Sequence, residues 1–175
     1  MKKLILLLLL TSFFFGTKLE AQQFIILKAG QNTQINGFTA SYIAALKKTK
    51  KGVDYYRVTV SITNMGSDFL QLFSQASRTF VKTDHNALAY FQFVNATGRG
   101  LSATSGKLYA HPLTMPVPYK CRKCPPPADS KKDPYNHYVV SYYIGLQFRN
   151  GATISRTYDI RVSEGTKPVV RVIIQ

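Results

Sequence analysis

The chain has 175 residues and a formal net charge of +15, with 23 lysines and arginines against eight acidic residues. So few carboxylates leave no clear acidic pair for glycoside hydrolysis, and the chain has neither a Gly-x-Ser-x-Gly elbow nor a glycine-rich phosphate loop. The positive charge instead predicts attraction to polyanions and anionic surfaces, and we expect a protein that is not an enzyme.

The first 21 residues have the order of a secretory signal peptide. A basic head, Met1-Lys2-Lys3, precedes an apolar run, and Ala21 supplies a small residue at the expected cleavage point. The alternative is an uncleaved N-terminal anchor helix, although the run is short for a membrane span. We therefore expect an exported protein that is periplasmic, outer-membrane-associated or extracellular, with residues 22–175 as a single mature domain.

The strongest strand pattern runs through residues 55–63, where apolar and polar residues alternate strictly. This alternation predicts a half-buried strand, because successive side chains of a strand point to opposite faces. The apolar face comprises Tyr56, Val58, Val60 and Ile62. Residues 64–68 favour a turn and end the strand.

Several other segments have the composition of strands. They are residues 24–28, 38–46, 69–73, 78–82, 86–94, 138–148, 153–162 and 169–174. Residues 69–73 are continuously apolar, which predicts a strand buried on both faces, and Asn150-Gly151 predicts a hairpin turn. The alanines of residues 38–46 also allow a helix, but the lysine-rich segment 47–52 that follows is typical of a turn between two strands. Strands with turns at this spacing predict an all-β sandwich or barrel.

The segment from Tyr56 to Gly66 resembles a known group of proteins. Its pattern is Tyr56-x-Val58-x-Val60-x-Ile62-Thr63-Asn64-x-Gly66. It is similar to the alternating strand and Thr-Asn-x-Gly turn of many bacterial secreted immunoglobulin-like sandwiches, such as the telokin-like extracellular group. The resemblance implies an antiparallel two-sheet immunoglobulin-like β-sandwich, here of about eight or nine strands, and it implies no catalytic residue.

Residues 112–134 form a proline-rich insertion. Seven of the eight prolines lie there, and proline neither donates to a sheet ladder nor continues a helix. We therefore expect a long irregular loop. The loop contains the two cysteines of the chain, Cys121 and Cys124, and export favours a disulfide between them.

Two chemical alternatives involve the same loop. One is zinc binding, because the loop and its flanks hold four residues of the types that zinc accepts. These are His111, Cys121, Cys124 and His137. The other is thiol redox chemistry, although the prolines after the second cysteine exclude the helix that a thioredoxin-like pair needs. The second-ranked prediction is thus a small metal-binding or redox-active envelope protein, whereas the first has no cofactor.

Lysines and arginines gather in two clusters, one near residue 50 and one in the insertion. The first comprises Lys47, Lys48, Lys50 and Lys51, and the second comprises Lys120, Arg122, Lys123, Lys131 and Lys132. The alternative interpretation is a pair of solvated charged loops. For an exported protein, the targets that fit these cations are an anionic glycan, a membrane surface or another envelope protein rather than nucleic acid.

Together these patterns predict an exported, non-catalytic binding or structural domain of the bacterial cell envelope. Self-association through an exposed strand edge is a further expectation. The candidate edge is residues 169–174, in which Arg171 is the only charged residue.

Overall fold

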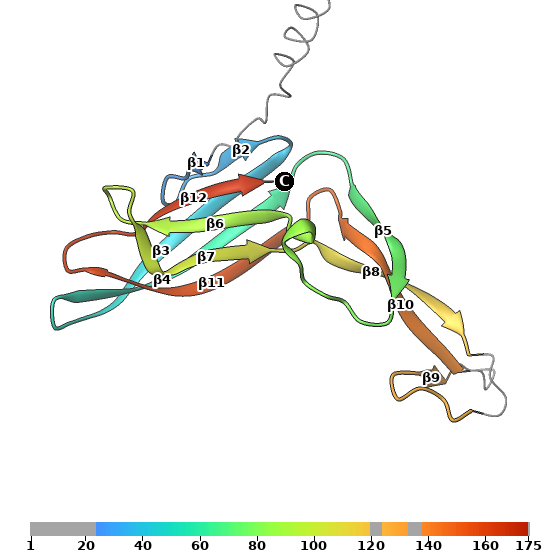
Figure 1. Cartoon of the computed structure of the whole chain (residues 1–175). Helices are drawn as coiled ribbons and strands as arrows, with labels where there is room; N and C mark the ends of the chain where they lie inside the picture. Colours follow the sequence, from blue (N-terminus) through green and yellow to red (C-terminus); the bar gives the residue numbers. More distant parts are fainter. Residues whose placement is uncertain (1–23, 120–123, 133–137, 175) are drawn as a thin grey trace, which may run out of the picture.

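The computed structural model describes residues 24–119, 124–132 and 138–174 (Figure 1). The predicted signal peptide lies outside the described residues. Within them the chain is all-β and every strand pairing is antiparallel, which confirms this part of the predicted fold class. No helix of the described part has the length and apolar character needed to span a membrane.

The described residues contain twelve strands and one short 3-10 helix. The strands of the first half are β1 (Ile25–Ile26), β2 (Thr33–Ile35), β3 (Phe38–Lys50), β4 (Val53–Asn64), β5 (Phe69–Ser77) and β6 (Ala89–Val94), with the helix η1 (Asp84–Asn86) before β6. Those of the second half are β7 (Gly100–Leu108), β8 (His111–Pro118), β9 (Lys131–Lys132), β10 (Tyr138–Phe148), β11 (Thr153–Ser163) and β12 (Val169–Ile174). The count exceeds the eight or nine predicted, partly because three strands have only two or three residues.

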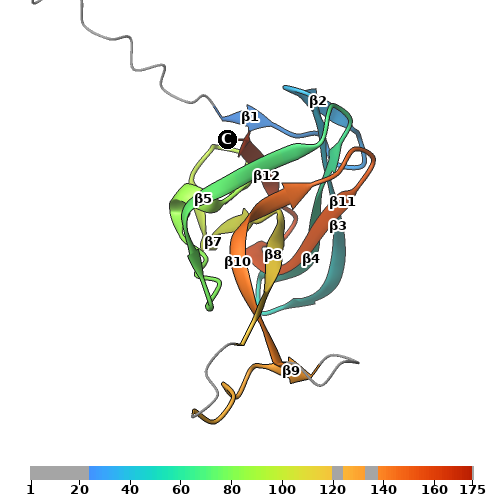
Figure 2. The ribbon, with the colours of Figure 1, turned by 90° about the vertical axis from the view of Figure 1, so that its right-hand side faces the viewer.

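The strands of the described residues form three sheets and not the two predicted. Sheet A has the order β1-β12-β6-β7, sheet B has the order β11-β4-β3-β2, and sheet C has the order β5-β10-β8 with β9 beside β10. Sheets A and B pack against each other, whereas sheet C extends away from them as an arm (Figures 1 and 2).

The hydrophobic core lies between sheets A and B. The apolar face predicted for residues 55–63 points into it, since Tyr56 is 7% exposed and Val58 is fully buried. Phe91 and Phe93 of β6 and Val172 of β12 are also fully buried and belong to the same cluster. The alternation in β4 is therefore confirmed as the signature of a core strand.

Three predicted strands differ from the structure in their environment. Residues 69–73 do form part of β5, but Leu70 and Leu72 are exposed because β5 is the edge of the arm and not a core strand. Residues 78–82 are not a strand; they lead to η1, and Phe80 packs against Tyr143 of sheet C. Residues 169–174 are not an edge, because β12 lies between β1 and β6.

The two predicted hairpin turns are confirmed only in part. The segment 38–46 is a strand, but β3 continues to Lys50, so that the turn itself is Lys51-Gly52, both with positive φ. Asn150-Gly151 does form a tight turn, in which the Ala152 amide donates to the Arg149 carbonyl over 3.1 Å. However, β10 and β11 do not pair with each other, because they belong to different sheets.

The first part of the proline-rich insertion is a strand, contrary to the expected irregular loop. The Tyr119 amide donates to the Tyr138 carbonyl over 2.6 Å, so odd-numbered amides here point toward β10. Pro112, Pro116 and Pro118 occupy even positions, where no donor to β10 is needed. An edge strand accepts proline at such positions, which explains why β8 forms despite its composition.

Candidate functional site

The first basic cluster lies at the end of the long hairpin of β3 and β4. Its turn needs two residues with positive φ, and Lys51 has φ 51° and Gly52 has φ 72°. Behind the turn, Asp54 is buried and accepts a 2.9 Å hydrogen bond from the Gly165 amide. The hairpin end is thus tied to the turn that follows β11.

Tyr55 is the centre of this region. It lies directly opposite Lys48 of β3 and directly opposite Arg161 of β11. The Lys48 Nζ stands 5.1 Å from the centroid of the Tyr55 ring, and the Arg161 Cζ stands 5.6 Å from it. One ring therefore contacts two cations from the two neighbouring strands, and each contact lies in the cation–π range.

A single carboxylate stands among the neighbouring cations. Asp159 is 70% exposed, and its Oδ1 lies 3.3 Å from the Lys47 Nζ and 3.8 Å from the Arg57 Nε. These exposed ion pairs add little stability, because solvent screens them. Asp159 balances only part of the charge of Lys47, Lys48, Arg57 and Arg161, so the region stays positive.

A cavity of about 420 Å³ opens among these residues. It is lined by Lys47, Lys48, Tyr55, Tyr56, Asp159 and Arg161. We call it the Tyr55 site. The site combines long basic side chains with an aromatic ring that contacts two of them, and basic side chains are of the kind that can bind anionic groups.

The second basic cluster is only partly described. Lys131 and Lys132 form β9 and are exposed at the end of the arm, whereas Lys120, Arg122 and Lys123 lie outside the described residues. The structure does not bring Lys131 or Lys132 to the Tyr55 site, because the arm extends from the opposite end of sheet B (Figure 1).

The predicted cysteine and zinc sites are also only partly described. Cys124 is exposed, and its carbonyl accepts a 2.9 Å hydrogen bond from the Tyr119 hydroxyl. Cys121 lies outside the described residues, so the disulfide stays a prediction. His111 is exposed on β8 and His137 is not described; within the described part of the chain, no three metal-binding side chains gather.

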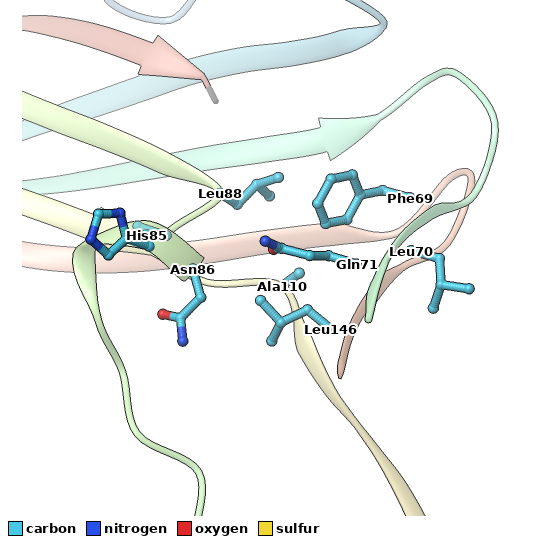
Figure 3. A pocket seen from close by; sticks show the side chains of 9 residues that line it. Phe69, Leu70, Gln71, His85, Asn86, Leu88, Ala110 and Leu146 are labelled. Carbon is cyan, nitrogen blue, oxygen red and sulfur yellow. The ribbon is translucent and has the colours of Figure 1, made fainter. Parts of the chain in front are cut away.

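A second cavity, of about 290 Å³, lies where the arm meets sheet A (Figure 3). Phe69, Gln71 and Leu146 point into it from sheet C, and His85 and Asn86 of η1 stand on the other side. Its lining is mainly apolar, and it contains none of the residues that the sequence singles out for binding.

Sequence reasoning identifies the lysines of the Tyr55 site and misses its other members. Tyr55 looks like one more packing tyrosine, and Arg161 is more than a hundred residues from Lys48. The sequence pattern that could have identified two of them is the alternation in residues 153–162, which places Asp159 and Arg161 on the polar face of a strand. Only the pairing of that strand with β4 brings them to Tyr55.

Comparison with known proteins finds no matching family model, curated protein or solved structure.

Proposed function

We propose that this protein is an exported, non-catalytic binding or structural domain of the bacterial cell envelope, and that the Tyr55 site binds an anionic glycan or another anionic surface. The observation that supports this proposal most strongly is the contact of one aromatic ring with cations from two neighbouring strands. Charge alone attracts any anion, whereas a ring that contacts two cations favours a ligand whose negative groups can meet both of them.

The placement of the site supports the same function. Lys50 and Lys51 add positive charge at the hairpin turn just beyond the cavity, and both are exposed. A large extended anion that reaches the cavity would thus also meet the turn. We infer that a polymer or a surface is a better ligand than a small isolated anion, because several cations act on it together.

Three finer proposals accompany this function. The N-terminal 21 residues direct export, and the cysteine pair forms a disulfide in the oxidising compartment. Sheets A and B form an immunoglobulin-like sandwich, for which the buried face of β4 and the Asn64 turn are the supporting features.

Retention on a column of sulfated polysaccharide tests the binding proposal. Lys48→Gln combined with Arg161→Gln should elute at clearly lower salt than the wild type. Lys82→Gln combined with Arg149→Gln is the matched control, because it removes the same charge from the other end of the molecule. Equal loss of retention in both double variants would reduce the effect to net charge and would contradict a site at Tyr55.

A further inference from the structure

The long free strand edges of the described residues are protected, with one exception. The edges β7 and β11 approach each other, and the Arg156 side chain of β11 donates to the Lys107 carbonyl of β7 over 3.3 Å. The edge β8 of sheet C contains three prolines, which cannot donate hydrogen bonds to an added strand. The part of β3 that β2 does not cover is also a free edge, but it ends in three lysines, Lys47, Lys48 and Lys50. The remaining long edge is β5, whose sequence FLQLFSQAS has neither a charge nor a proline.

The outer edge of β5 is available for hydrogen bonding. Among the described strands, β5 pairs only with β10. The Gln71 carbonyl faces β10. Its oxygen lies so close to Gly145 of β10 that a Cβ added at Gly145 would collide with it. Backbone groups of successive strand residues point in opposite directions, so the amides and carbonyls of Leu70 and Leu72 face away from β10.

The side chains of β5 differ on its two faces. Phe69 and Gln71 point into the cavity beside η1, whereas Leu70 points away from it (Figure 3). Leu70 is 58% exposed and Leu72 is 64% exposed, and the two share one face of the sheet. An uncharged edge with two exposed leucines is the kind of edge that soluble proteins usually block.

The sequence of this edge is a palindrome. Residues 69–73 read Phe-Leu-Gln-Leu-Phe in both directions. Two copies paired antiparallel about Gln71 would therefore place Leu70 opposite the Leu72 of the second copy, and Phe69 opposite its Phe73. This self-complementarity is what a twofold interface requires, because the same surface must fit itself.

We propose that β5 pairs with the β5 of a second copy of this chain, antiparallel and centred on Gln71, to join two arms into one continuous sheet. In this register the outward backbone groups of Leu70 and Leu72 form two hydrogen-bonded residue pairs around the twofold axis. The four leucines cover one another on one face. No charged residue of one strand meets a charge on the other, because β5 has none.

The charge of the chain gives this association a distinctive salt dependence. Each copy has a formal net charge of +15, so two copies repel each other at low ionic strength. Added salt screens the repulsion but leaves the pairing of the leucines and backbones intact. Dimerisation should therefore strengthen with salt, whereas binding of an anionic glycan should weaken, so the two proposals fail independently.

Molar mass by light scattering, measured over a wide range of protein concentrations, tests the proposal. The wild type should approach twice the monomer mass, and Leu70→Lys combined with Leu72→Lys should stay monomeric. Ile43→Lys combined with Leu46→Lys, which adds the same charges to exposed apolar positions of β3, should still dimerise. A monomeric wild type at the highest soluble concentration, or a dimer that survives the β5 substitutions, overturns the proposal.

Two further variants test the register itself. Leu72→Pro removes an outward amide without touching the ladder to β10, so it should abolish the dimer and preserve the strand content. In a chain with Cys121→Ser and Cys124→Ser, Gln71→Cys should form a disulfide-linked dimer, because opposed residues of a pair without hydrogen bonds stand about 4.5 Å apart. Gln75→Cys is the control that should not. Cross-linking at residue 75 and not at residue 71 overturns the proposed register.

Discussion

The side-chain amide of Asn64 donates a 2.7 Å hydrogen bond to the carbonyl oxygen of Phe148. Asn64 is the last residue of β4, and Phe148 is the last residue of β10. The same amide nitrogen donates to the Ser67 carbonyl over 2.8 Å, and the Asn64 Oδ1 accepts from the Gly66 amide over 3.0 Å. One buried side chain thus fixes the place where the chain leaves sheet B for the arm and the place where it returns.

Asn64→Ala should lower the free energy of unfolding by about 2–4 kcal/mol, because it leaves buried backbone groups without partners. Urea unfolding followed by circular dichroism measures this loss. Thr63→Ala is the control, since its hydroxyl bonds only to Thr153 on an exposed face, and it should cost about 1 kcal/mol or less. A loss for Asn64→Ala no larger than the control would show that the turn does not depend on this side chain.

The substitution Tyr158→Phe should stabilise the protein. Its ring packs on Phe93 with centroids 4.9 Å apart, and its hydroxyl is buried with no hydrogen-bond partner among the described residues. Tyr158→Phe keeps the packing and removes an unsatisfied polar group, so we expect a gain of about 1 kcal/mol in the free energy of unfolding. A destabilised Tyr158→Phe variant would mean that the hydroxyl has a partner after all.

A side chain at position 106 should destabilise the fold. A Cβ at this position would overlap the hydroxyl end of the Tyr158 side chain, which stands directly above it. Gly106→Ala should therefore lower the free energy of unfolding by about 1–3 kcal/mol through overpacking. The double variant with Tyr158→Phe should recover part of this loss, and strictly additive effects in the thermal unfolding of the single and double variants would contradict the contact.

Stability should fall when the pH rises above about 10. Burial raises the pKa of Tyr42 and the pKa of Tyr158 above the ordinary value of 10.0, the latter against the opposing effect of Arg156. The unfolded chain then loses these protons first, so stability that is present below pH 10 is lost as the pH rises through the folded pKa values. Urea midpoints on both sides of pH 10 should fall less steeply for Tyr42→Phe combined with Tyr158→Phe; an equal slope would exclude these two groups as the cause.

The only carboxylate of the Tyr55 site should oppose anion binding. Asp159 pairs with Lys47 and lies near Arg57, and it would repel an incoming negative group. Asp159→Asn should therefore raise the affinity for a sulfated polysaccharide severalfold. Asp129→Asn is the matched control, because Asp129 is also an exposed aspartate paired with an arginine, Arg78, and it lies on the arm. An equal gain in both variants would indicate an effect of net charge alone.

The core of the fold is predictable from local sequence, and the arm is not. The alternation around Val58 identifies a half-buried strand, because a strand between the core and solvent must alternate. Residues 69–73 have the apolar composition of a core strand. However, β5 is an edge strand, and no described residue covers most of the Leu70 side chain, which is exposed. The prolines of β8 likewise mark an edge strand and not a loop, and only the pairing with β10 distinguishes the two.

The candidate site follows the same rule. The lysines near residue 50 form a run that is visible in the sequence, whereas Arg161 joins Lys48 only through their common neighbour Tyr55. Pairing of strands that are distant in sequence is a tertiary property, and composition does not predict it. The sequence alone therefore identifies the positive charge and misses the aromatic ring that contacts two of the cations.

The most direct test of the Tyr55 site is the affinity of Tyr55→Ala for a sulfated oligosaccharide, measured by isothermal titration calorimetry. This substitution leaves the net charge unchanged. We expect a loss of about fivefold to tenfold, which corresponds to about 1 kcal/mol, and near wild-type affinity for Tyr55→Phe, because phenylalanine keeps a ring between Lys48 and Arg161. Wild-type affinity in a correctly folded Tyr55→Ala variant would contradict the account, because binding would then depend on charge and not on this site.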